Sequence, residues 1–480
     1  MPSPGITIGI DVATAHIRAV ALDPGGVDLV FGPVEASLSS PVRGGQGEVS
    51  QTPDYAVVAR DVMGQLIAGL GQKRASAITA LCVTATSGTL IPCDDQGKPL
   101  GDALMYNDQR GDSAVREHVA EHVADRPSPS IGRLWWIATH TRATQVLSPA
   151  DVVLADLAGG HVLPADTSHH LKSAIDPLAL TWPWGLLDAL DVSRSLLPAL
   201  VRPGLVVGHI APSIAKELGV GPDVALVSGM TDGCTSQMST GGIALGDTVG
   251  VLGTTLVIKA TSKNPVTDPE RGVYSHVSPD GHFLPGGASN VGVGSLPPEL
   301  VNGDRSILHQ AIETAGASGL ASTVHYPLPG RGERFPFHQP AAQALWAGTP
   351  TSITDTVRSV MEGVGFIERL GLETLAEHGA SSTRHFLSGG GSKSASWNQL
   401  RASILGTSVL VPRYSDSAVG AALLASATHS RETVADLARA VLPEPTIVEP
   451  REDDHAALDD RYHEMRTLLE SAGYITPRAD

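Results

Sequence analysis

The first residues of the chain alternate isoleucine with small or polar side chains, a pattern typical of a strand. The segment 6–11 places its isoleucines on one face and ends at Asp11. Two further apolar runs, 17–22 and 27–31, follow, and Asp-Pro-Gly-Gly at 23–26 is a turn signal between them. The pattern predicts three strands in a meander.

A helix and a fourth strand are predicted after the meander. Thr52 followed by Pro53 is typical of a helix start, with threonine as N-cap and proline at the first helical position. Apolar residues continue at helical spacing as far as Leu70, and the run 77–83 returns to strand character. The first half therefore has the order β-β-β-α-β.

The second half of the chain repeats this order of elements without a residue-level repeat. Its predicted strands are 247–252, 255–258, 272–277, 282–284, 385–387 and 408–411, and its predicted helices are 352–378, 395–405 and 417–427. The repetition predicts an α/β protein of two domains, residues 1–243 and 244–445. Residues 446–480 are predicted to form a tail whose late helix, 456–471, packs on the body.

Charge and composition exclude several classes of protein. The 480 residues carry a formal net charge of -17, which argues against a general nucleic-acid binder because a phosphate backbone repels an acidic surface. The three cysteines, Cys82, Cys93 and Cys234, form no CxxC and support neither a disulfide framework nor a cysteine zinc site. No apolar run approaches the roughly 18 residues of a membrane-spanning helix, and no signal peptide is recognisable. We expect a soluble, cytoplasmic protein with no nucleic-acid or membrane partner.

Two acidic residues follow predicted strands. Asp11 ends the first strand, and Asp232 follows the apolar run 224–227. Open α/β sheets place ligand-binding groups just beyond the carboxyl ends of their strands. Either aspartate taken alone is more simply read as a turn former.

Two glycine-containing segments have the composition of phosphate-binding backbone. Gly253-Thr-Thr255 joins two predicted strands and offers N–H and hydroxyl donors. In the segment 388–394, Ser-Gly-Gly-Gly-Ser-Lys-Ser, three glycines connect a strand to a helix and allow close approach of a nucleotide. This is not a Walker A loop, because Ser392 stands where that motif has glycine before Lys393. An ordinary turn is the alternative at both places.

The loop 106–110, Tyr-Asn-Asp-Gln-Arg, gathers an amide, an acid and a guanidinium. Such a cluster suits a polyhydroxylated ligand, which requires many directional donors and acceptors. The alternative is a solvated loop before a helix near Ser113.

Taken together, these segments resemble the FGGY family of carbohydrate kinases from about residue 6 to residue 427. The matching segments occur in family order: 8–11 with Thr14 and Arg18, 106–110, 229–233, 252–255, and 387–397 with Asn398. Within the family the chain looks most similar to the D-ribulose kinase branch, which is related to xylulose kinases. The stretches that support this are 85–89, 103–108, 272–276, 286–290 and 332–336.

The resemblance implies two ribonuclease-H-like (actin-like ATPase) domains around a central cleft. It implies phosphoryl transfer from ATP, with Mg²⁺, to the primary 5-hydroxyl of a ketopentose, for which D-ribulose is the first expectation. Asp232 would accept the proton of the attacking hydroxyl, and Asp11 would hold the metal ion through water. The resemblance also implies a homodimer. The implied substrate-binding residues are Thr86, Ser87, Asn107, Asp108, Arg110 and Asp232. The implied cofactor-binding residues are Asp11, Thr14, Arg18, Gly253, Thr254, Thr255, Gly389, Gly390, Gly391 and Asn398.

The first phosphate segment departs from the family pattern. Where the family has Asp-x-Gly-Thr, this chain has Ala13 in place of the glycine, and Ala15 and His16 follow Thr14. If the position required a positive φ, alanine would cost about 1 kcal/mol there.

Other functions compete with the ketopentose kinase. D-xylulose or a pentitol is an alternative substrate, and the alanines at 13 and 15 are compatible with a non-catalytic sugar or nucleotide sensor. The segment 118–122, His-Val-Ala-Glu-His, matches the HxxEH motif of zinc metalloproteases but lies in a charged stretch typical of an exposed helix. His169 and His170 are interpreted as structural, because neighbouring side chains on a strand point apart.

Overall fold

The computed structural model describes residues 5–45, 47–119 and 128–477. The chain divides into two compact units. The first unit consists of residues 1–239, 276–281 and 416–442, and the second of residues 240–275, 282–415 and 443–480. Each unit is described by itself below.

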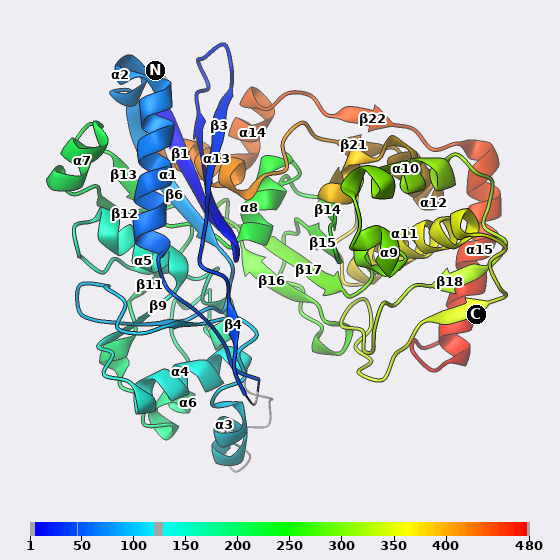
Figure 1. Cartoon of the computed structure of the whole chain (residues 1–480), viewed down its shortest axis with the longest axis horizontal. Helices are drawn as coiled ribbons and strands as arrows, with labels where there is room; N and C mark the ends of the chain where they lie inside the picture. Colours follow the sequence, from blue (N-terminus) through cyan, green and yellow to red (C-terminus); the bar gives the residue numbers. More distant parts are fainter. Residues whose placement is uncertain (1–4, 46, 120–127, 478–480) are drawn as a thin grey trace. The chain divides into compact units, whose positions relative to one another are not determined.

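The first unit is built on a six-stranded sheet whose centre is β1 (Ile6–Val12), all seven residues of which are buried (Figure 1). β1 runs antiparallel to β2 (His16–Leu22), which pairs with β3 (Val30–Ser37). On its other side β1 runs parallel to β6 (Ile78–Ala85). The sheet continues through β13 (Ala225–Val227) to β12 (Val206–His209).

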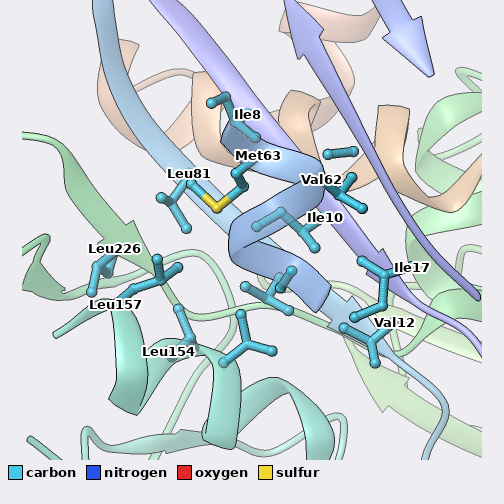
Figure 2. Packing of buried hydrophobic residues seen from close by; sticks show 14 of the residues in the cluster. Ile8, Ile10, Val12, Ile17, Val62, Met63, Leu81, Leu154, Leu157 and Leu226 are labelled. Atoms are coloured by element: carbon cyan, nitrogen blue, oxygen red, sulfur yellow. The ribbon is translucent and has the colours of Figure 1, made fainter. Parts of the chain in front are cut away.

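One face of this sheet carries the main hydrophobic core of the first unit. Figure 2 shows Ile8 and Ile10 of β1 beside Val62 and Met63 of α1 (Tyr55–Leu70). Leucines of α5 (Pro149–Leu157) and β13 extend the same core. The alternation of isoleucines along β1 therefore reflects burial of one face against these helices.

The opposite face of β1 packs against α13 (Ser417–Ser430) with almost no side chain between the two backbones. A Cβ added to Gly9 would lie 1.9 Å from the carbonyl oxygen of Ala418. A Cβ added to Gly420 would lie 1.8 Å from the carbonyl oxygen of Thr235 in α8 (Asp232–Ser239). The two glycines thus let α13 touch both β1 and α8.

A long segment between β6 and β12 adds further elements to the first unit around a separate apolar cluster. They include β7 (Ile91–Cys93), β8 (Ala103–Leu104), α3 (Asp112–Val119), α4 (Pro129–His140), β9 (Gln145–Leu147), β10 (Ala165–Asp166), α6 (Trp184–Ala189) and β11 (Leu200–Val201), and α7 (Pro212–Leu218) follows β12. The short strands β4 (Val42–Arg43) and β5 (Val49–Gln51) form a small sheet with β8. Of these elements, the sequence indicated only α3, as a helix near Ser113.

The second unit has a seven-stranded sheet in the order β16-β17-β15-β14-β20-β21-β22. Its elements are β14 (Asp247–Leu252), β15 (Leu256–Ala260), β16 (Tyr274–Val277), β17 (Phe283–Ser289), α10 (Arg305–Gly316), β18 (Val324–Tyr326), β19 (Leu345–Ala347), α11 (Ile353–Glu377), β20 (Arg384–Ser388), α12 (Ala395–Leu405), β21 (Val409–Val411), β22 (Thr446–Val448) and α15 (Glu452–Ser471). The order β17-β15-β14-β20-β21 repeats β3-β2-β1-β6-β13 of the first unit, with the same parallel and antiparallel pairs. The prediction of two ribonuclease-H-like α/β units is thereby confirmed.

Several predicted boundaries differ from the structure. The third strand begins at Val30 rather than at residue 27, and Val27 is fully exposed. The first helix begins at Tyr55 after Asp54, two residues beyond the predicted proline start. The segment 416–442, with α13 and α14 (Val434–Val441), joins the first unit, although a division at residue 243 would place it in the second domain.

The last helix, α15, is part of the core of the second unit. Leu458, Tyr462, Met465 and Leu469 of this helix are buried there. Among the helices that the structure describes, none is both long and apolar enough to span a membrane.

Candidate active site

Asp11 lies near the end of β1 with only 2% of its surface exposed. Its Oδ2 accepts a hydrogen bond from Nη2 of Arg18 at 3.0 Å, while its buried Oδ1 has no hydrogen-bond partner among the described residues. Burial raises the pKa of Asp11 to about 7. The charges of Asp232 and Asp416 act in the same direction, and Arg18 opposes them. Asp11 is thus a buried carboxylate with one oxygen left for a cation or a water molecule.

Arg18 joins Asp11 to a residue far away in the sequence. Arg18 is opposite Asp11 in the β1–β2 pair, and its Nη1 donates to Oδ2 of Asp416 at 2.7 Å. Asp416 is also the N-cap of α13, because its Oδ1 accepts from the N–H of Ala418. Sequence reasoning missed Asp416, since no local pattern marks a pair so far apart.

Asp232 is the first residue of α8 and is half-buried. Its Oδ1 accepts a hydrogen bond from the N–H of Gly233 at 2.7 Å, and its carbonyl accepts from the hydroxyl of Ser417 in α13. A carboxylate at a helix N-terminus is stabilised in its charged form by the helix dipole. The charge of Asp232 contributes to the raised pKa of Asp11, and the pairing of Val12 with Ala85 and of Ala85 with Thr231 brings the two segments to the same end of the sheet.

Thr86 and Ser87 follow the carboxyl end of β6 and are half-buried. The residue before them, Ala85, forms a parallel bridge with Thr231, which precedes Asp232. The hydroxyl of Thr84 donates to the carbonyl of Met230 at 2.6 Å. The first unit therefore brings the loop after β6 beside the start of α8.

Asp108 has no exposed surface, and its carboxylate is fully engaged. Oδ2 accepts from the N–H of Val49 at 2.7 Å, and Arg110 binds both carboxylate oxygens through Nε. In contrast, Tyr106 and Asn107 are exposed. Asp108 therefore holds Arg110 and the loop in place, and Asn107 is the neighbour with surface available to a ligand.

Arg133 of α4 connects two of the predicted sugar-binding segments. This arginine is 1% exposed, and its Nε donates to the carbonyl of Gly88 while its Nη1 donates to the carbonyl of Asp108. The loop after β6 and the loop 106–110 are thus linked by one buried guanidinium. Sequence reasoning missed Arg133, because a buried arginine in an apolar helix resembles any exposed one in the sequence.

In the second unit, the turn Gly253–Thr255 lies between β14 and β15 and presents Thr254 to solvent. Gly389, at a φ of +83°, follows β20 and packs against the end of β14, where an added Cβ would lie 2.6 Å from the carbonyl oxygen of Leu252. The structure thus places Gly389 and Gly391 beside the strand that leads into the turn. Gly390 has open space around its Cα.

Asn398 lies in the first turns of α12, behind the glycines. Its Nδ2 donates to the carbonyl of Ser392 at 2.7 Å, and its buried Oδ1 finds no hydrogen-bond partner in the part of the chain that the structure describes. Ser394 caps the helix by accepting from the N–H of Trp397. The glycines and Asn398 therefore belong to one strand–turn–helix feature.

The strain considered at Ala13 is not present. Ala13 is not among the described residues with a positive φ, and its N–H donates to the carbonyl of His16 at 3.0 Å in the β1–β2 turn. Thr14 is half-buried in the same turn, and its carbonyl accepts from Gln51. Alanine is accommodated here because the turn keeps an ordinary backbone conformation.

The described residues do not support a zinc site at the HxxEH segment 118–122. His118 lies in α3, but Ala120, Glu121 and His122 of the HxxEH segment lie outside the described residues. Within residues 5–45, 47–119 and 128–477, no three His, Cys, Asp or Glu side chains gather as a metal site.

Two units whose sheets share one strand order, with the same parallel and antiparallel pairs, define the actin-like ATPase fold. The FGGY family of carbohydrate kinases matches the chain through its N-terminal domain at residues 6–239 and through its C-terminal domain at residues 248–429. The chain belongs to this family. It is therefore a carbohydrate kinase, a phosphotransferase whose substrates are a sugar and ATP, and enzymes of this family typically use a divalent metal ion.

Individual relatives are distant but cover nearly the whole chain. A xylulose kinase of Staphylococcus epidermidis is 23% identical over 98% of both chains. A gluconokinase of Bacillus subtilis is 22% identical over 96% of this chain and 94% of the relative. The crystal structure of a xyloylose kinase from Brucella ovis has a similar fold, with a TM-score of 0.86 and 22% identity over 98% of this chain and 99% of that chain.

Proposed function

We propose that this enzyme transfers the γ-phosphoryl group of ATP to the primary 5-hydroxyl of a ketopentose, with D-ribulose as the first candidate and D-xylulose as the second. One observation carries the proposal: Val12 pairs with Ala85 and Ala85 pairs with Thr231, so the neighbouring residues Asp11 and Asp232 lie at the same end of one sheet. Phosphoryl transfer to an alcohol needs a proton acceptor and a place for the cation that accompanies ATP. The two carboxylates supply these functions.

Asp232 is the proton acceptor in this proposal. Its carboxylate lies at the start of α8, where the helix dipole favours a negative charge, and part of its surface is exposed to an incoming hydroxyl. Proton removal accounts for about 10²–10⁴-fold of the rate. The remainder comes from alignment of the hydroxyl with the phosphate and from charge neutralisation.

Asp11 fits a divalent cation such as Mg²⁺, since the partnerless Oδ1 is a buried acceptor. A bound cation supplies charge neutralisation at the phosphates. Because Asp11 brings only one free oxygen, and the residues that the structure describes form no cluster of three ligands around it, the contact suits a hydrated ion that keeps most of its water. Arg18 holds the carboxylate in place by binding its other oxygen.

The sugar side of the site consists of Thr86, Ser87 and Asn107, with Asp108 and Arg110 fixing the loop behind them. In the first unit, Thr14 and Arg18 are the residues proposed to bind nucleotide. In the second unit, the proposed nucleotide-binding residues are the turn Gly253–Thr255, the glycines 389–391 and Asn398. Asn398 Oδ1 is an acceptor without a partner, as a contact to the amino group of adenine or a ribose hydroxyl requires.

A substrate panel tests the proposal. ADP release would be measured with ATP and Mg²⁺ in the presence of D-ribulose, D-xylulose, D-gluconate and the matching pentitols, with a no-sugar control for ATP hydrolysis. We expect the highest kcat/KM with a ketopentose and phosphorylation at C5. Preference for gluconate or a pentitol would reject the proposed substrate class.

A further inference from the structure

Residues 166–169, Asp-Thr-Ser-His, follow β10 and are buried beside both the loop after β6 and the start of α8. Asp166 organises this segment: its Oδ1 accepts from the N–H groups of Ser168 and His169 at 2.9 and 2.8 Å. Its Oδ2 lies 2.5 Å from Nδ1 of His169. The carboxylate therefore fixes both the backbone turn and the imidazole.

His169 holds the loop after β6. Nε2 of the imidazole accepts a hydrogen bond from the N–H of Ala85 at 3.0 Å, one residue before Thr86. This contact requires Nε2 to carry no proton, so Nδ1–H donates to Asp166. Burial lowers the pKa of His169, whereas the contacts with Asp166 raise it, and the net shift is upward. A proton on Nε2 would nevertheless point at the N–H of Ala85, and the hydrogen bond between them would be lost. The neutral tautomer is therefore the one that binds the loop.

Ser168 holds the start of α8. Its Oγ accepts from the N–H of Thr231 at 3.2 Å, one residue before Asp232. The same Oγ lies 3.0 Å from Nδ1 of His276, to which its own hydrogen can be donated. Ser168 and His169 are thus adjacent in the sequence and bind the two strand ends that meet in the Ala85–Thr231 bridge.

We propose that Asp166, Ser168 and His169 together position the sugar-binding loop after β6 relative to the catalytic Asp232. His169 and Ser168 accept hydrogen bonds from the N–H groups of Ala85 and Thr231, and Asp166 holds both residues in place. The inference rests on the proposed roles of Thr86, Ser87 and Asp232. None of the three residues is assigned contact with substrate. They act by satisfying two buried backbone N–H groups, each of which is costly to leave without an acceptor.

His170 provides a matched control. It is as buried as His169 and is likewise paired with an aspartate, although through the other ring nitrogen: its Nε2 lies 2.9 Å from Oδ2 of Asp151. Asp151, however, belongs to the capping box of α5 with Ser148, and His170 packs against Trp182. A substitution at His170 therefore removes a buried His–Asp pair without touching Ala85 or Thr231.

Substitution of His169 by asparagine or by glutamine distinguishes a positioning role of the imidazole from a role in packing alone. In His169→Asn the side-chain amide occupies the place of Nδ1 and keeps the bond to Asp166, but the acceptor for Ala85 is lost. In His169→Gln an amide oxygen reaches the place of Nε2 and restores that acceptor. We expect His169→Asn to raise the sugar KM about tenfold, the effect of one lost buried hydrogen bond, and His169→Gln and His170→Asn to change it less than threefold.

Ser168→Ala tests the second contact independently. Because its target is the N–H before Asp232, we expect kcat to fall about tenfold while the sugar KM stays within twofold. A fall in stability without this split between kcat and KM would show that Ser168 is only structural and would overturn the proposal.

Hydrogen–deuterium exchange gives a readout that needs no substrate. In the full-length enzyme, the amide of Ala85 is expected to exchange faster in His169→Asn than in the wild type, His169→Gln or His170→Asn, and the amide of Thr231 faster in Ser168→Ala. Unchanged protection of Ala85 in His169→Asn, or equal loss in His170→Asn, would overturn the inference. If the wild type phosphorylates no ketopentose, the proposed function fails, whereas the exchange comparison still decides the positioning role.

Discussion

Arg18 and Asp416 are 398 residues apart in the sequence, and Nη1 of the first lies 2.7 Å from Oδ2 of the second. Asp416 is the first residue of the segment that returns from the second unit to the first. The arginine that binds Asp11 is therefore held by the start of α13. The position of the arginine that neutralises Asp11 at the end of β1 therefore depends on a helix encoded near the other end of the chain.

Asp416→Asn is expected to raise the KM for ATP about threefold or more, because Arg18 loses one of its two carboxylate partners. Stability should change little, since asparagine is as good an N-cap as aspartate. Asp416→Ala is the companion variant, and we expect it to lose about 1 kcal/mol of stability in addition. Steady-state kinetics with varied ATP and thermal unfolding check both; an unchanged ATP KM in Asp416→Asn would remove Arg18 from the proposed nucleotide-binding residues.

Asp232→Asn is expected to lower turnover at least ~100-fold with little effect on folding, because the amide cannot accept a proton from the sugar hydroxyl. ADP release at saturating substrates measures the loss, and thermal unfolding shows that the fold is retained. Asp223→Asn, an exposed aspartate before β13, is the matched control and should keep normal turnover. Near-normal turnover in Asp232→Asn would reject the base assignment.

Asp108→Ala is expected to raise the KM for the sugar far more than the KM for ATP. The substitution releases Arg110 and leaves the N–H of Val49 without its acceptor, so the loop 106–110 loses its conformation. Initial rates with each substrate varied in turn provide the measurement, and Asp102→Asn, exposed nearby, is the control. The reverse pattern would contradict the sugar-loop assignment.

Gly9→Ala is expected to destabilise the protein by about 3 kcal/mol or more, because the new Cβ would overlap backbone atoms that have little room to move. Those atoms are Ala418 O at 1.9 Å and Ala422 N at 2.5 Å. Gly25→Ala, where nothing lies within 4 Å, is the control. Denaturant unfolding of the two variants should differ clearly; equal midpoints would show that α13 can move away from β1 at little cost.

The lowered pKa of Glu368 predicts that the second unit loses stability in acid. Burial alone would raise the pKa of Glu368, but Arg401 and His385 outweigh it and lower the pKa to about 2. Since the folded pKa lies below the ordinary value of 4.5, the stabilisation is complete above about pH 4.5 and is lost as the pH falls towards 2.

Glu368→Gln should lose this pH-dependent contribution and be destabilised at neutral pH by about 3–5 kcal/mol, because Arg401 then stays buried without a countercharge. Thermal unfolding between pH 3 and pH 7 makes the comparison, with Glu377→Gln, exposed on the same helix, as control. An acid response in Glu368→Gln equal to that of the wild type would assign the sensitivity to other groups.

Local signals explain which elements could be predicted from the sequence. α12 matches its predicted bounds because Ser394 caps it and Gly406 ends it in the left-handed conformation. β1 was recognisable because one of its faces is uniformly isoleucine. Most of the elements between residues 86 and 200 are short, and several pack around a cluster of their own, so no period of 2 or 3.6 was sustained long enough to identify most of them.

The candidate site was predictable where a residue type follows a strand end, as with Asp11 and Asp232. It was not predictable where a buried partner gives a residue its role. Arg133, Asp416 and Ser168 bind atoms 25 or more residues away, and His169 differs from His170 only in which aspartate and which backbone group it meets. Such pairings exist only after the chain has folded.

The close packing of α13 on Gly9 has a consequence for synthesis of the protein. During translation, β1 leaves the ribosome among the first residues, but the helix that covers its second face is made only after β14, β15, β20 and β21 of the second unit. The second face of β1 therefore stays without its covering helix while 170 residues of the second unit are synthesised. A chain halted before residue 416 would contain every strand of that sheet, Asp11 and Asp232, but it would lack the helix that covers the second face of β1.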